Sequence, residues 1–364
     1  MKLIFWQNII SIHQLPFLNA LSKNRDVILI VGNELTEDLK NAGWIIPDFE
    51  DIELIVSPNS TEVANLLHLY HNEWHIISGI NAYPLPSLAL KLAIAINVEN
   101  IAVLTESFKT VGFKGMLRKI KYKVASLKYR NYIKAIFVTG KMARRCFENL
   151  YFSNNILFDW GYFTQISNGC ETNETIRSLP NLLFVGSIDK RKNIISVLPD
   201  VIKHSHLFDT FYISGTGSLL YKLKSVIGNK NNIKYLGVNQ NDSIQSLMKN
   251  CDLLILPSLF DGWGAVVNEA LCNGMRVFCS ENCGSSILLD DDKRGGIFKF
   301  EENNFKNGLR KWLEKGVISN KERKGIIEWS REHISGQVAA QYFTDSINFL
   351  ETNEGIKPVA PWIK

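Results

Sequence analysis

The stretch LLILPSLFDGWGAVVNEALCNG, residues 253–274, runs from one apolar segment through a loop into another. The first segment predicts a buried strand, and the second predicts a helix over Gly264–Asn273 with Gly274 as its C-terminal cap. A strand followed directly by a helix is the repeating unit of an α/β fold. Asp261 lies in the loop and Glu269 in the predicted helix, so an acid stands on each side of the junction.

The start of this helix predicts an anion-binding site. The backbone N–H groups of Trp263, Gly264 and Ala265 have no partner within the helix and can bind an anion. Asp261 and Glu269 beside such a site fit a ligand that brings hydroxyls as well as phosphate. A sugar nucleotide carries a diphosphate, a ribose diol and sugar hydroxyls, so it is the expected ligand. The alternative is an ordinary capped helix.

Strands and helices alternate along both halves of the chain. Short apolar runs predict strands at residues 2–6, 26–32, 52–57, 73–79, 100–105, 135–140, 181–187, 208–217, 232–238, 252–258, 276–280 and 295–300. Helices are expected between them, including one at residues 33–43. The pattern predicts the α/β class with two doubly wound, Rossmann-like parallel sheets. We expect one domain over residues 1–168 and another over residues 178–334, joined by a polar linker near residues 165–180.

Small and charged residues follow several of the predicted strands. In open parallel sheets, ligands bind outside the carboxyl ends of the strands. We therefore expect these strand ends to face one another across a cleft between the two domains.

One such strand end is VGSIDKRKN, residues 185–193. Gly186 allows a sharp turn, Ser187 follows it, and Arg191 and Lys192 stand just before the next predicted helix. Cations at a helix N-terminus oppose the helix dipole. A diphosphate at this position accounts for them, because guanidinium, ammonium and backbone N–H groups all bind phosphate. A solvated basic turn is the alternative.

A second glycine turn, ISGTGS at residues 213–218, follows another predicted strand. It does not complete the dinucleotide-binding fingerprint, because Leu220 stands where the third glycine is needed. A plain strand–helix turn is the alternative to a role for Gly215 in binding the donor.

The second half of the chain resembles the donor-binding domain of the family 4 glycosyltransferases, which have the two-domain GT-B fold. The hallmark of that family is two acids separated by seven residues, and Asp261 and Glu269 have this spacing. NEALCNGMRVFCSENCG, residues 268–284, fits the sequence that follows the second acid, and residues 185–193 resemble the diphosphate-binding turn. EWSREHIS, residues 328–335, resembles the crossover that returns to the first domain, so the closing helix at about residues 335–364 is expected to join that domain.

The resemblance implies a role for each of these residues. Glu269 would accept hydrogen bonds from the ribose hydroxyls, and Asp261 would hold the transferred sugar. The site would also include the backbone amides of Gly262, Trp263 and Gly264, which would hold the sugar and the β-phosphate together with Asp261. Arg191 and Lys192 would neutralise the leaving diphosphate, where the transition state gathers charge.

Four positions depart from the family pattern. Asp261 is one methylene shorter than the usual glutamate, which leaves the identity of the sugar open. Met275 and Arg276 replace a small residue and a proline, and Ser187 stands where arginine is usual.

The acceptor side is less clear from the sequence, because the family's histidine motif is missing from its expected strand end. Glu106 follows a predicted strand and could orient or deprotonate an acceptor hydroxyl. A helix-capping or ion-paired acid is the alternative. His13 follows the first strand and could also line the cleft, although a lone histidine is commonly structural.

Positive charge is concentrated in one segment. Residues 107–147 contain twelve Lys and Arg and no Asp or Glu, so the rest of the chain has 29 basic and 36 acidic residues. On a helix, residues 114–136 of this segment would present an apolar and aromatic stripe edged with cations, which suits an anionic lipid surface. The expected membrane contacts are Arg118, Lys119, Lys121, Tyr122 and Lys123. A solvated helix face is the alternative, and nucleic acid is disfavoured because no nucleic-acid-binding motif accompanies the charge.

Composition limits the remaining classes. No apolar run is long enough to span a bilayer, and the N-terminus reads as a buried strand and not as a signal peptide. The six cysteines form no metal-ligand pattern and are expected to be reduced thiols in a cytoplasmic protein. They are Cys146, Cys170, Cys251, Cys272, Cys279 and Cys283. No metal or other cofactor is expected, because Arg191 and Lys192 can take the role of a cation and no Asp-x-Asp motif ends a strand.

The sequence therefore predicts a retaining hexosyltransferase of GT-B fold that uses a nucleotide-diphosphate sugar, with a UDP-sugar expected. The acceptor would be a saccharide, lipid-linked, in the synthesis of a bacterial surface polysaccharide such as O-antigen, capsule or lipopolysaccharide. The enzyme would lie peripherally on the inner face of the plasma membrane. The alternatives are a GT-B-like sugar-nucleotide epimerase and a non-enzymatic module that binds anions or nucleic acid.

Overall fold

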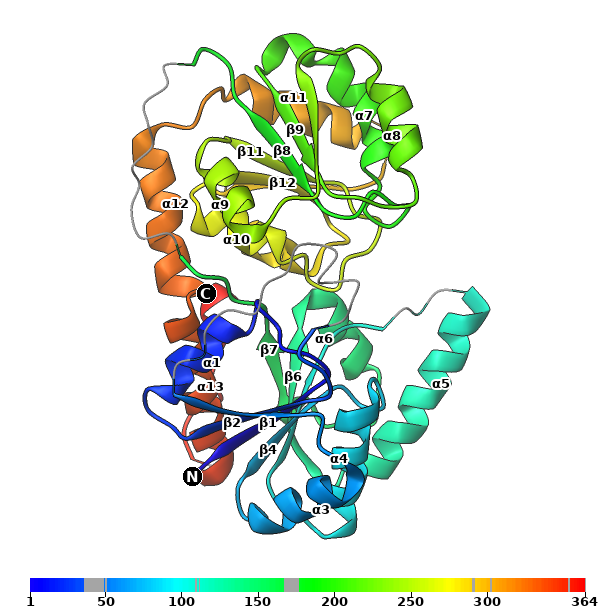
Figure 1. The fold of residues 1–364 in the computed structure, drawn as a ribbon, viewed down its shortest axis with the longest axis vertical. Coiled ribbons are helices and arrows are strands. Elements are labelled where there is room, and N and C mark those ends of the chain that lie inside the picture. The colour runs from blue at the N-terminus through cyan, green and yellow to red at the C-terminus, as the bar shows by residue number, and fades with distance from the viewer. Residues whose placement is uncertain are drawn as a thin grey trace. The chain divides into compact units, whose positions relative to one another are not determined.

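The computed structural model describes residues 1–35, 49, 51–108, 110, 112–166, 177–289, 292–301, 303–352 and 354–363. These residues divide into two compact units (Figure 1). The first unit contains the described residues up to Thr164 and those from Ser335 onward, and the second contains those between them. The expected helix at residues 33–43 and the expected linker at residues 165–180 lie largely outside the described residues.

The first unit is built on a seven-stranded parallel sheet with the order β3-β2-β1-β4-β5-β6-β7. Its strands are β1 (Leu3–Gln7), β2 (Val27–Val31), β3 (Ile52–Val56), β4 (Trp74–Ser78), β5 (Ile101–Thr105), β6 (Ile133–Thr139) and β7 (Leu157–Trp160). Every residue of β1, β2 and β5 is buried, because helices cover both faces of a parallel sheet. β7, which the sequence did not predict, has four residues and pairs with β6.

The helices of the first unit include the last long helix of the chain. They are α1 (Leu15–Ser22), α3 (Ser60–Leu69), α4 (Pro84–Ala95), α5 (Gly112–Tyr129), α6 (Gly140–Glu148), the 3₁₀ turns Asn154–Ile156 and Pro361–Ile363, and α13 (Gly336–Thr352). α13 packs closely on α1, and a Cβ at Gly336 would lie 2.1 Å from the backbone oxygen of Pro16. The closing helix therefore belongs to the core of the first unit.

The second unit is built on a six-stranded parallel sheet with the order β10-β9-β8-β11-β12-β13. Its strands are β8 (Leu182–Val185), β9 (Phe211–Ser214), β10 (Ile233–Gly237), β11 (Leu253–Leu256), β12 (Arg276–Ser280) and β13 (Gly295–Phe298). Its helices are α7 (Ile194–Lys203), α8 (Leu220–Ile227), α9 (Asn241–Lys249), α10 (Val266–Cys272), α11 (Asn304–Glu314) and α12 (Asn320–His333), with 3₁₀ turns at Ser205–Leu207 and Gly284–Leu289. The prediction of two doubly wound parallel sheets is confirmed.

Both strand orders reverse direction once, between β1 and β4 in the first sheet and between β8 and β11 in the second. At such a reversal, the loops after the two neighbouring strands diverge to opposite faces and leave a crevice at their carboxyl ends. In the second unit, the loops that flank this point begin at Gly186 and Pro257. The topology therefore places the two sequence motifs of the second half side by side.

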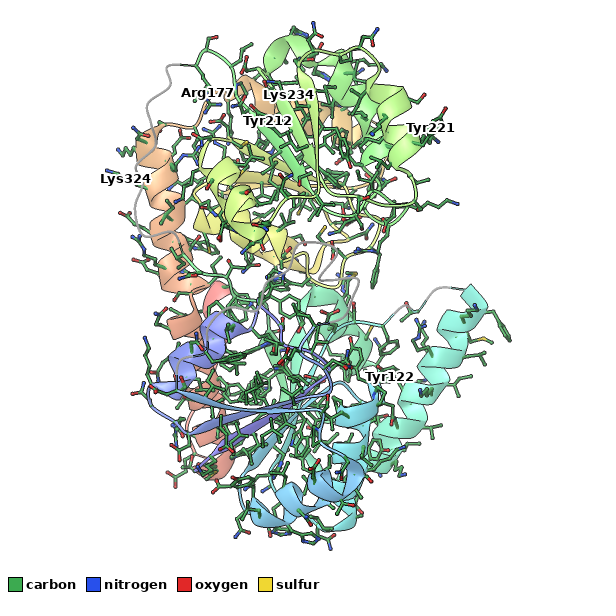
Figure 2. All side chains as sticks on the ribbon, in the orientation of Figure 1. Tyr122, Arg177, Tyr212, Tyr221, Lys234 and Lys324 are labelled. Carbon is green, nitrogen blue, oxygen red and sulfur yellow. The ribbon has the colours of Figure 1, made fainter. Side chains whose placement is uncertain are left out.

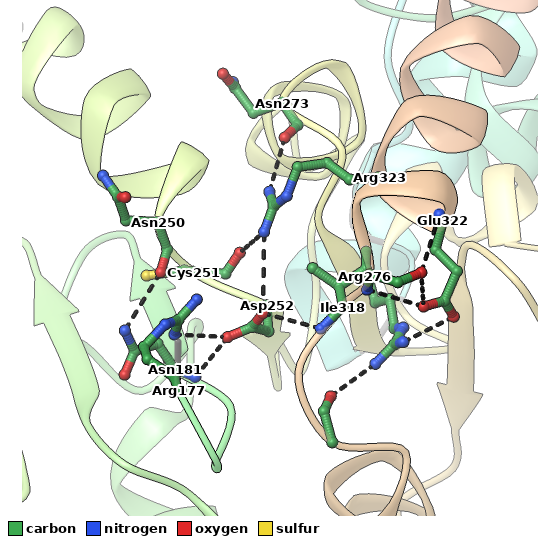
Figure 3. A network of polar contacts seen from close by, with 12 residues as sticks. Arg177, Asn181, Asn250, Cys251, Asp252, Asn273, Arg276, Ile318, Glu322 and Arg323 are labelled. Carbon is green, nitrogen blue, oxygen red and sulfur yellow. Dashed lines mark hydrogen bonds and ion pairs between the residues drawn. The ribbon is translucent and has the colours of Figure 1, made fainter. Parts of the chain in front are cut away.

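A buried polar network around Asp252 lies at the amino ends of the central strands β8 and β11 (Figure 3). The Asp252 carboxylate accepts hydrogen bonds from the backbone N–H groups of Asn181, at 2.7 Å, and Ile318, at 3.0 Å. The guanidinium of Arg177 donates to it at 2.9 Å. Buried Arg323 donates to the backbone oxygens of neighbouring turns, so one network joins the first strand of the unit to α12. This network stabilises the frame on the side away from the strand carboxyl ends.

Candidate functional site

The turn after β8 is organised by Asp189. The backbone N–H of Lys192 donates to the Asp189 carboxylate at 2.8 Å, and the hydroxyl of Ser187 donates to it at 2.9 Å. Gly186 has a φ of +155°, and a Cβ there would approach the Lys192 methylenes to 3.3 Å. The turn thus folds the Lys192 side chain back across the end of β8.

Lys192 reaches the acid of the opening stretch. Its ammonium lies 2.5 Å from the Asp261 carboxylate, and the Arg191 guanidinium lies 3.6 Å from the other carboxylate oxygen. Lys192 and Asp261 are 9% and 8% exposed, whereas the Arg191 side chain is 40% exposed. The family resemblance implies that Asp261 holds the transferred sugar and that Arg191 and Lys192 neutralise the diphosphate. In the structure Lys192 is paired with Asp261, and Arg191 is the cation with surface left for a ligand.

The loop from Asp261 to Ala265 is fixed by the residues that follow β12 (Arg276–Ser280). The backbone N–H of Asp261 donates to Asn282, and the N–H of Gly284 donates back to Asp261. A Cβ at Gly284 would lie 2.1 Å from the backbone oxygen of Gly262, so only glycine allows this close approach. The loop is therefore held rigidly at the end of β11.

One expectation for this loop needs correction. The helix α10 begins at Val266, two residues later than predicted, because Gly264 has a φ of +90° and cannot be helical. The indole of Trp263 is buried and donates to the Asn268 side chain at 2.7 Å, so this residue presents only its backbone. Within the described residues, no hydrogen bond uses the N–H groups of Trp263, Gly264 or Ala265. Gly274 has a φ of +72°, which confirms it as the helix cap.

Glu269 is the fourth residue of α10 and is 9% exposed. Burial raises the pKa of its carboxyl to about 7, against the opposing effect of the Lys192 charge. A carboxyl that gains its charge near neutral pH is suited to accept hydrogen bonds from hydroxyls.

The glycine turn after β9 lies against the turn after β8. A Cβ at Gly215 would lie 1.9 Å from the backbone oxygen of Gly186, and one at Gly217 would lie 2.5 Å from that of Ile188. The N–H of Ile188 donates to Thr216, which ties the turns together. The two glycines thus serve close packing beside the site, a reason that the pattern of the motif did not indicate.

In the first unit, Glu106 follows β5 and is exposed. The hydroxyl of Tyr162 donates to its carboxylate, and the Tyr162 ring lies 5.9 Å from the His13 ring. Burial lowers the pKa of His13 to about 4, so its imidazole is neutral at pH 7. The structure therefore joins the two acceptor-side candidates through Tyr162, a residue that the sequence did not indicate because β7 was not recognised.

The basic segment contains α5, which stands at the margin of the first unit (Figure 1). Its exposed apolar side chains recur every three or four residues: Phe113, Met116, Leu117, Ile120, Val124 and Leu127. Arg118, Lys119, Lys121 and Lys123 are exposed on the same helix. The expected membrane contact of Tyr122 is wrong. Its ring stacks on buried Phe108 at 4.1 Å and faces the body of the unit (Figure 2).

Other classes of site find little support in the part of the chain that the structure describes. No three His, Cys, Asp or Glu side chains gather there where a metal ion could bind. The five cysteines in that part are free thiols, and Cys170 lies outside it. Among the same residues, no helix combines the length and hydropathy needed to cross a bilayer.

Comparison with known proteins identifies a family that part of this chain matches. Residues 174–333 match the family described as Glycosyl transferases group 1. This segment is a Glycosyl transferases group 1 domain. It contains the turn after β8, Asp261 and Glu269, whereas His13, Glu106 and α5 lie outside it. The similarity therefore accounts for the second unit.

Two curated relatives each match less than half of the chain. An uncharacterized glycosyltransferase of Methanocaldococcus jannaschii is 30% identical over 153 residues, which are 41% of this chain and 42% of the relative. An uncharacterized protein in the cps region of Klebsiella pneumoniae is 29% identical over 143 residues, 37% of each chain. The chain thus spans less than half the length of the curated relatives it matches.

Solved structures resemble the whole chain. A glycosyltransferase from Rickettsia africae has a TM-score of 0.71 at 13% identity, covering 97% of this chain and 99% of its own. The Anabaena protein HepE in complex with UDP has a TM-score of 0.68 at 15% identity, covering 96% and 100%. A complex of the same protein with UDP-glucose has a TM-score of 0.66 at 14% identity, covering 96% and 99%. These likenesses show that the Glycosyl transferases group 1 domain is part of a GT-B fold.

Proposed function

We propose that this protein transfers a hexose from a UDP-sugar to a saccharide acceptor with retention of the anomeric configuration. The observation that carries the proposal is the meeting of Arg191, Lys192 and Asp261 beside Glu269 at the switch point of the second sheet. The matched family supports glycosyl transfer, and the solved complexes of HepE with UDP and UDP-glucose support the nucleotide. Retention and the hexose rest on the resemblance to family 4.

The chemistry follows from where charge develops. As the sugar leaves the donor, negative charge gathers on the diphosphate, and Arg191 with the N–H groups of Trp263 and Gly264 would stabilise it. Glu269 would accept hydrogen bonds from the ribose hydroxyls. Lys192 holds the Asp261 carboxylate in place, and Asp261 would accept a hydroxyl of the transferred sugar.

Thermal unfolding with a panel of nucleotides tests the donor site. UDP and UDP-glucose are expected to raise the melting temperature more than GDP-mannose or ADP-glucose, because a ligand of the folded state stabilises it. Glu269→Gln should abolish most of the UDP effect, whereas Glu328→Gln, at an exposed position on α12, should keep it. Equal responses of the two variants to UDP would refute the assignment of Glu269.

The acceptor proposed is a lipid-linked saccharide in the synthesis of a bacterial surface polysaccharide. One supporting fact is the relative in the cps region of Klebsiella pneumoniae. A sugar-nucleotide epimerase would convert its donor without an acceptor, so incubation with UDP-glucose alone separates the two functions. A binding module for nucleic acid would instead retard an oligonucleotide in a gel and release no UDP from UDP-glucose.

Turnover is proposed to need no metal ion, because the cation Arg191 lies where the diphosphate is proposed to bind. Transfer should therefore keep its rate in excess EDTA. A rate that falls with EDTA and returns with Mg²⁺ or Mn²⁺ would contradict this part of the proposal.

We also propose that α5 attaches the enzyme to the inner face of the plasma membrane. Its exposed apolar stripe lies among cations, and residues 107–147 contain no acid to oppose them. Such a helix lies in the interface of an anionic bilayer with its apolar side chains inserted. Arg118, Lys119, Lys121 and Lys123 would contact the lipid phosphates.

Co-sedimentation with vesicles tests this attachment. The protein should bind phosphatidylglycerol vesicles more strongly than phosphatidylcholine vesicles, and salt should weaken the binding. Ile120→Ser with Val124→Ser should weaken it about tenfold, since inserted apolar surface contributes alongside charge. Lys324→Glu on α12 is the control for charge (Figure 2). Binding that ignores lipid charge and salt would refute the proposal.

A further inference from the structure

Three neighbouring strand ends of the first sheet carry polar groups that the donor site does not use. Glu106 follows β5, Thr139 ends β6, and Tyr162 follows β7. These strands are adjacent in the order β5-β6-β7, so the three residues lie along one edge of the sheet. Two residues far apart in sequence, Glu106 and Tyr162, meet there through a hydrogen bond.

This edge contains buried hydroxyls without partners. Within the described residues, neither the hydroxyl of Ser107 nor that of Thr139 makes a hydrogen bond, although both oxygens are buried. Buried polar atoms are rarely left unpaired in folded proteins. Two of them beside the Glu106–Tyr162 pair indicate a place where a polar ligand binds.

Aromatic side chains stand beside the carboxylate. Tyr83, at the start of α4, is 46% exposed. Burial and then the charge of Glu106 raise the pKa of its phenol. The Tyr162 ring, whose hydroxyl binds Glu106, lies 5.9 Å from the His13 ring. Aromatic faces and a fixed carboxylate are the groups that a sugar ring needs, because its C–H face is apolar and its edge carries hydroxyls.

The Tyr162 hydroxyl also limits how the Glu106 carboxylate can bind. It donates to one carboxylate oxygen, Oε1. Among the described residues, no hydrogen bond is made to the other oxygen, Oε2. The carboxylate of an exposed glutamate rotates freely unless a neighbour holds it, so Tyr162 selects one orientation of Glu106.

We infer that Tyr162 is a positioning residue for Glu106, and that the two bind a hydroxyl of the saccharide acceptor. The inference rests on the proposed function, since it names the residues with which that reaction holds its acceptor. Glu106 Oε2 accepts the hydrogen bond from the sugar hydroxyl, and Tyr162 keeps Oε1 occupied.

Saturation-transfer NMR with a panel of methyl glycosides tests the site without turnover. The wild-type protein should transfer saturation to at least one glycoside, and Glu106→Gln should abolish the signal. Tyr162→Phe keeps the ring beside His13 and removes only the hydroxyl, so it should weaken glycoside binding about tenfold. Tyr221→Phe, an exposed tyrosine of the second unit, should have no effect (Figure 2).

The thermal shift with UDP is measured on each variant in parallel. Tyr162→Phe and Glu106→Gln should keep the wild-type melting temperature and its rise with UDP, which excludes a merely structural effect. Glycoside binding that is unchanged in both variants overturns the inference, as does a wild-type protein that binds UDP and no glycoside. Loss of the UDP response in the wild-type protein instead refutes the donor function, whatever the glycosides do.

Discussion

Asp261 and Lys192 form the most consequential pair of residues in the second unit. Both are nearly buried, and the two charged atoms lie 2.5 Å apart. Removing one partner of a buried pair leaves an uncompensated charge, which is costly. The pair therefore links the donor site to the stability of the domain.

We expect Lys192→Met to lower the free energy of unfolding by about 3 kcal/mol, because Asp261 would lose its nearest cation. Arg191→Met should cost less than about 1 kcal/mol, since Arg191 is 40% exposed and 3.6 Å away. Urea unfolding of both variants measures the difference. Equal losses would show that the ion pair is not what stabilises the loop.

Glu269 predicts a pH dependence of nucleotide binding. Its folded pKa of about 7 means that the carboxyl gains its charge as the pH rises through neutrality. The charged form accepts hydrogen bonds from ribose hydroxyls more strongly. The affinity for UDP should therefore rise from pH 6 to pH 8 by calorimetry, and Glu269→Gln should remove this rise. An unchanged pH profile in the variant would assign it to another group.

The contact of Tyr162 with Glu106 is one that the sequence alone could not predict. The seven-residue spacing of Asp261 and Glu269 could be read from the sequence, because both acids belong to one strand–helix unit. The contact of Lys192 with Asp261 could not, since the residues are 69 positions apart and meet only because β8 and β11 are neighbours. Tyr162 meets Glu106 in the same way, across 56 positions.

Among the elements, the turns after β8 and β9 depend on each other. A Cβ at Gly215 would lie 1.9 Å from a backbone oxygen of the neighbouring turn, and the φ of Gly215 is +137°. The turn that carries Arg191 and Lys192 is therefore placed partly by a glycine that need not touch the ligand.

Gly215→Ala should lower the free energy of unfolding by at least about 3 kcal/mol and weaken UDP binding, because the backbone of one turn must move. Gly237→Ala is the matched control, since Gly237 has a φ of +75° and open space around it. The control should lose only about 1 kcal/mol. Denaturant unfolding and UDP titration of both variants measure the contrast, and similar losses would mean that backbone strain alone decides.

The predicted and observed boundaries of helices and strands differ most where contacts between distant segments set the structure. The basic helix is expected to continue to residue 136, but α5 ends at Tyr129, and the strand expected at residues 135–140 begins earlier, as β6 at Ile133. β7 escaped notice because its four residues are too short to show a periodic pattern. Both differences lie where strand pairing, a non-local interaction, sets the structure.

For the whole molecule, acid stability should depend on a buried histidine. His75 accepts a hydrogen bond from the Trp6 indole at 3.0 Å, and its other ring nitrogen lies 3.0 Å from the Tyr70 oxygen. Burial lowers its pKa to about 4. An unfolded histidine binds its proton near pH 6.5, so the unfolded state holds more protons between these values. Stability from this group is thus present above pH 6.5 and is lost as the pH falls toward 4.

From pH 7.5 to pH 5, His75 should remove about 2 kcal/mol from the free energy of unfolding. Glu269 acts with the opposite sign, because its raised pKa favours the folded state as the pH falls toward 4.5. The measurement is therefore the difference in pH slope between the wild-type protein and His75→Gln in urea. Equal slopes would contradict the role of His75.

Local sequence patterns were enough to predict the α/β class, the two parallel sheets and the strand–turn–helix units that carry Asp261, Glu269 and Arg191. These follow from local patterns, since apolar periodicity and glycine turns act over a few residues. The folded chain was needed to show that Lys192 pairs with Asp261, that Tyr162 donates a hydrogen bond to Glu106, and that Tyr122 faces the body of its unit. The physical reason is that strand order brings distant segments together, and one sequence carries no direct record of which strands become neighbours.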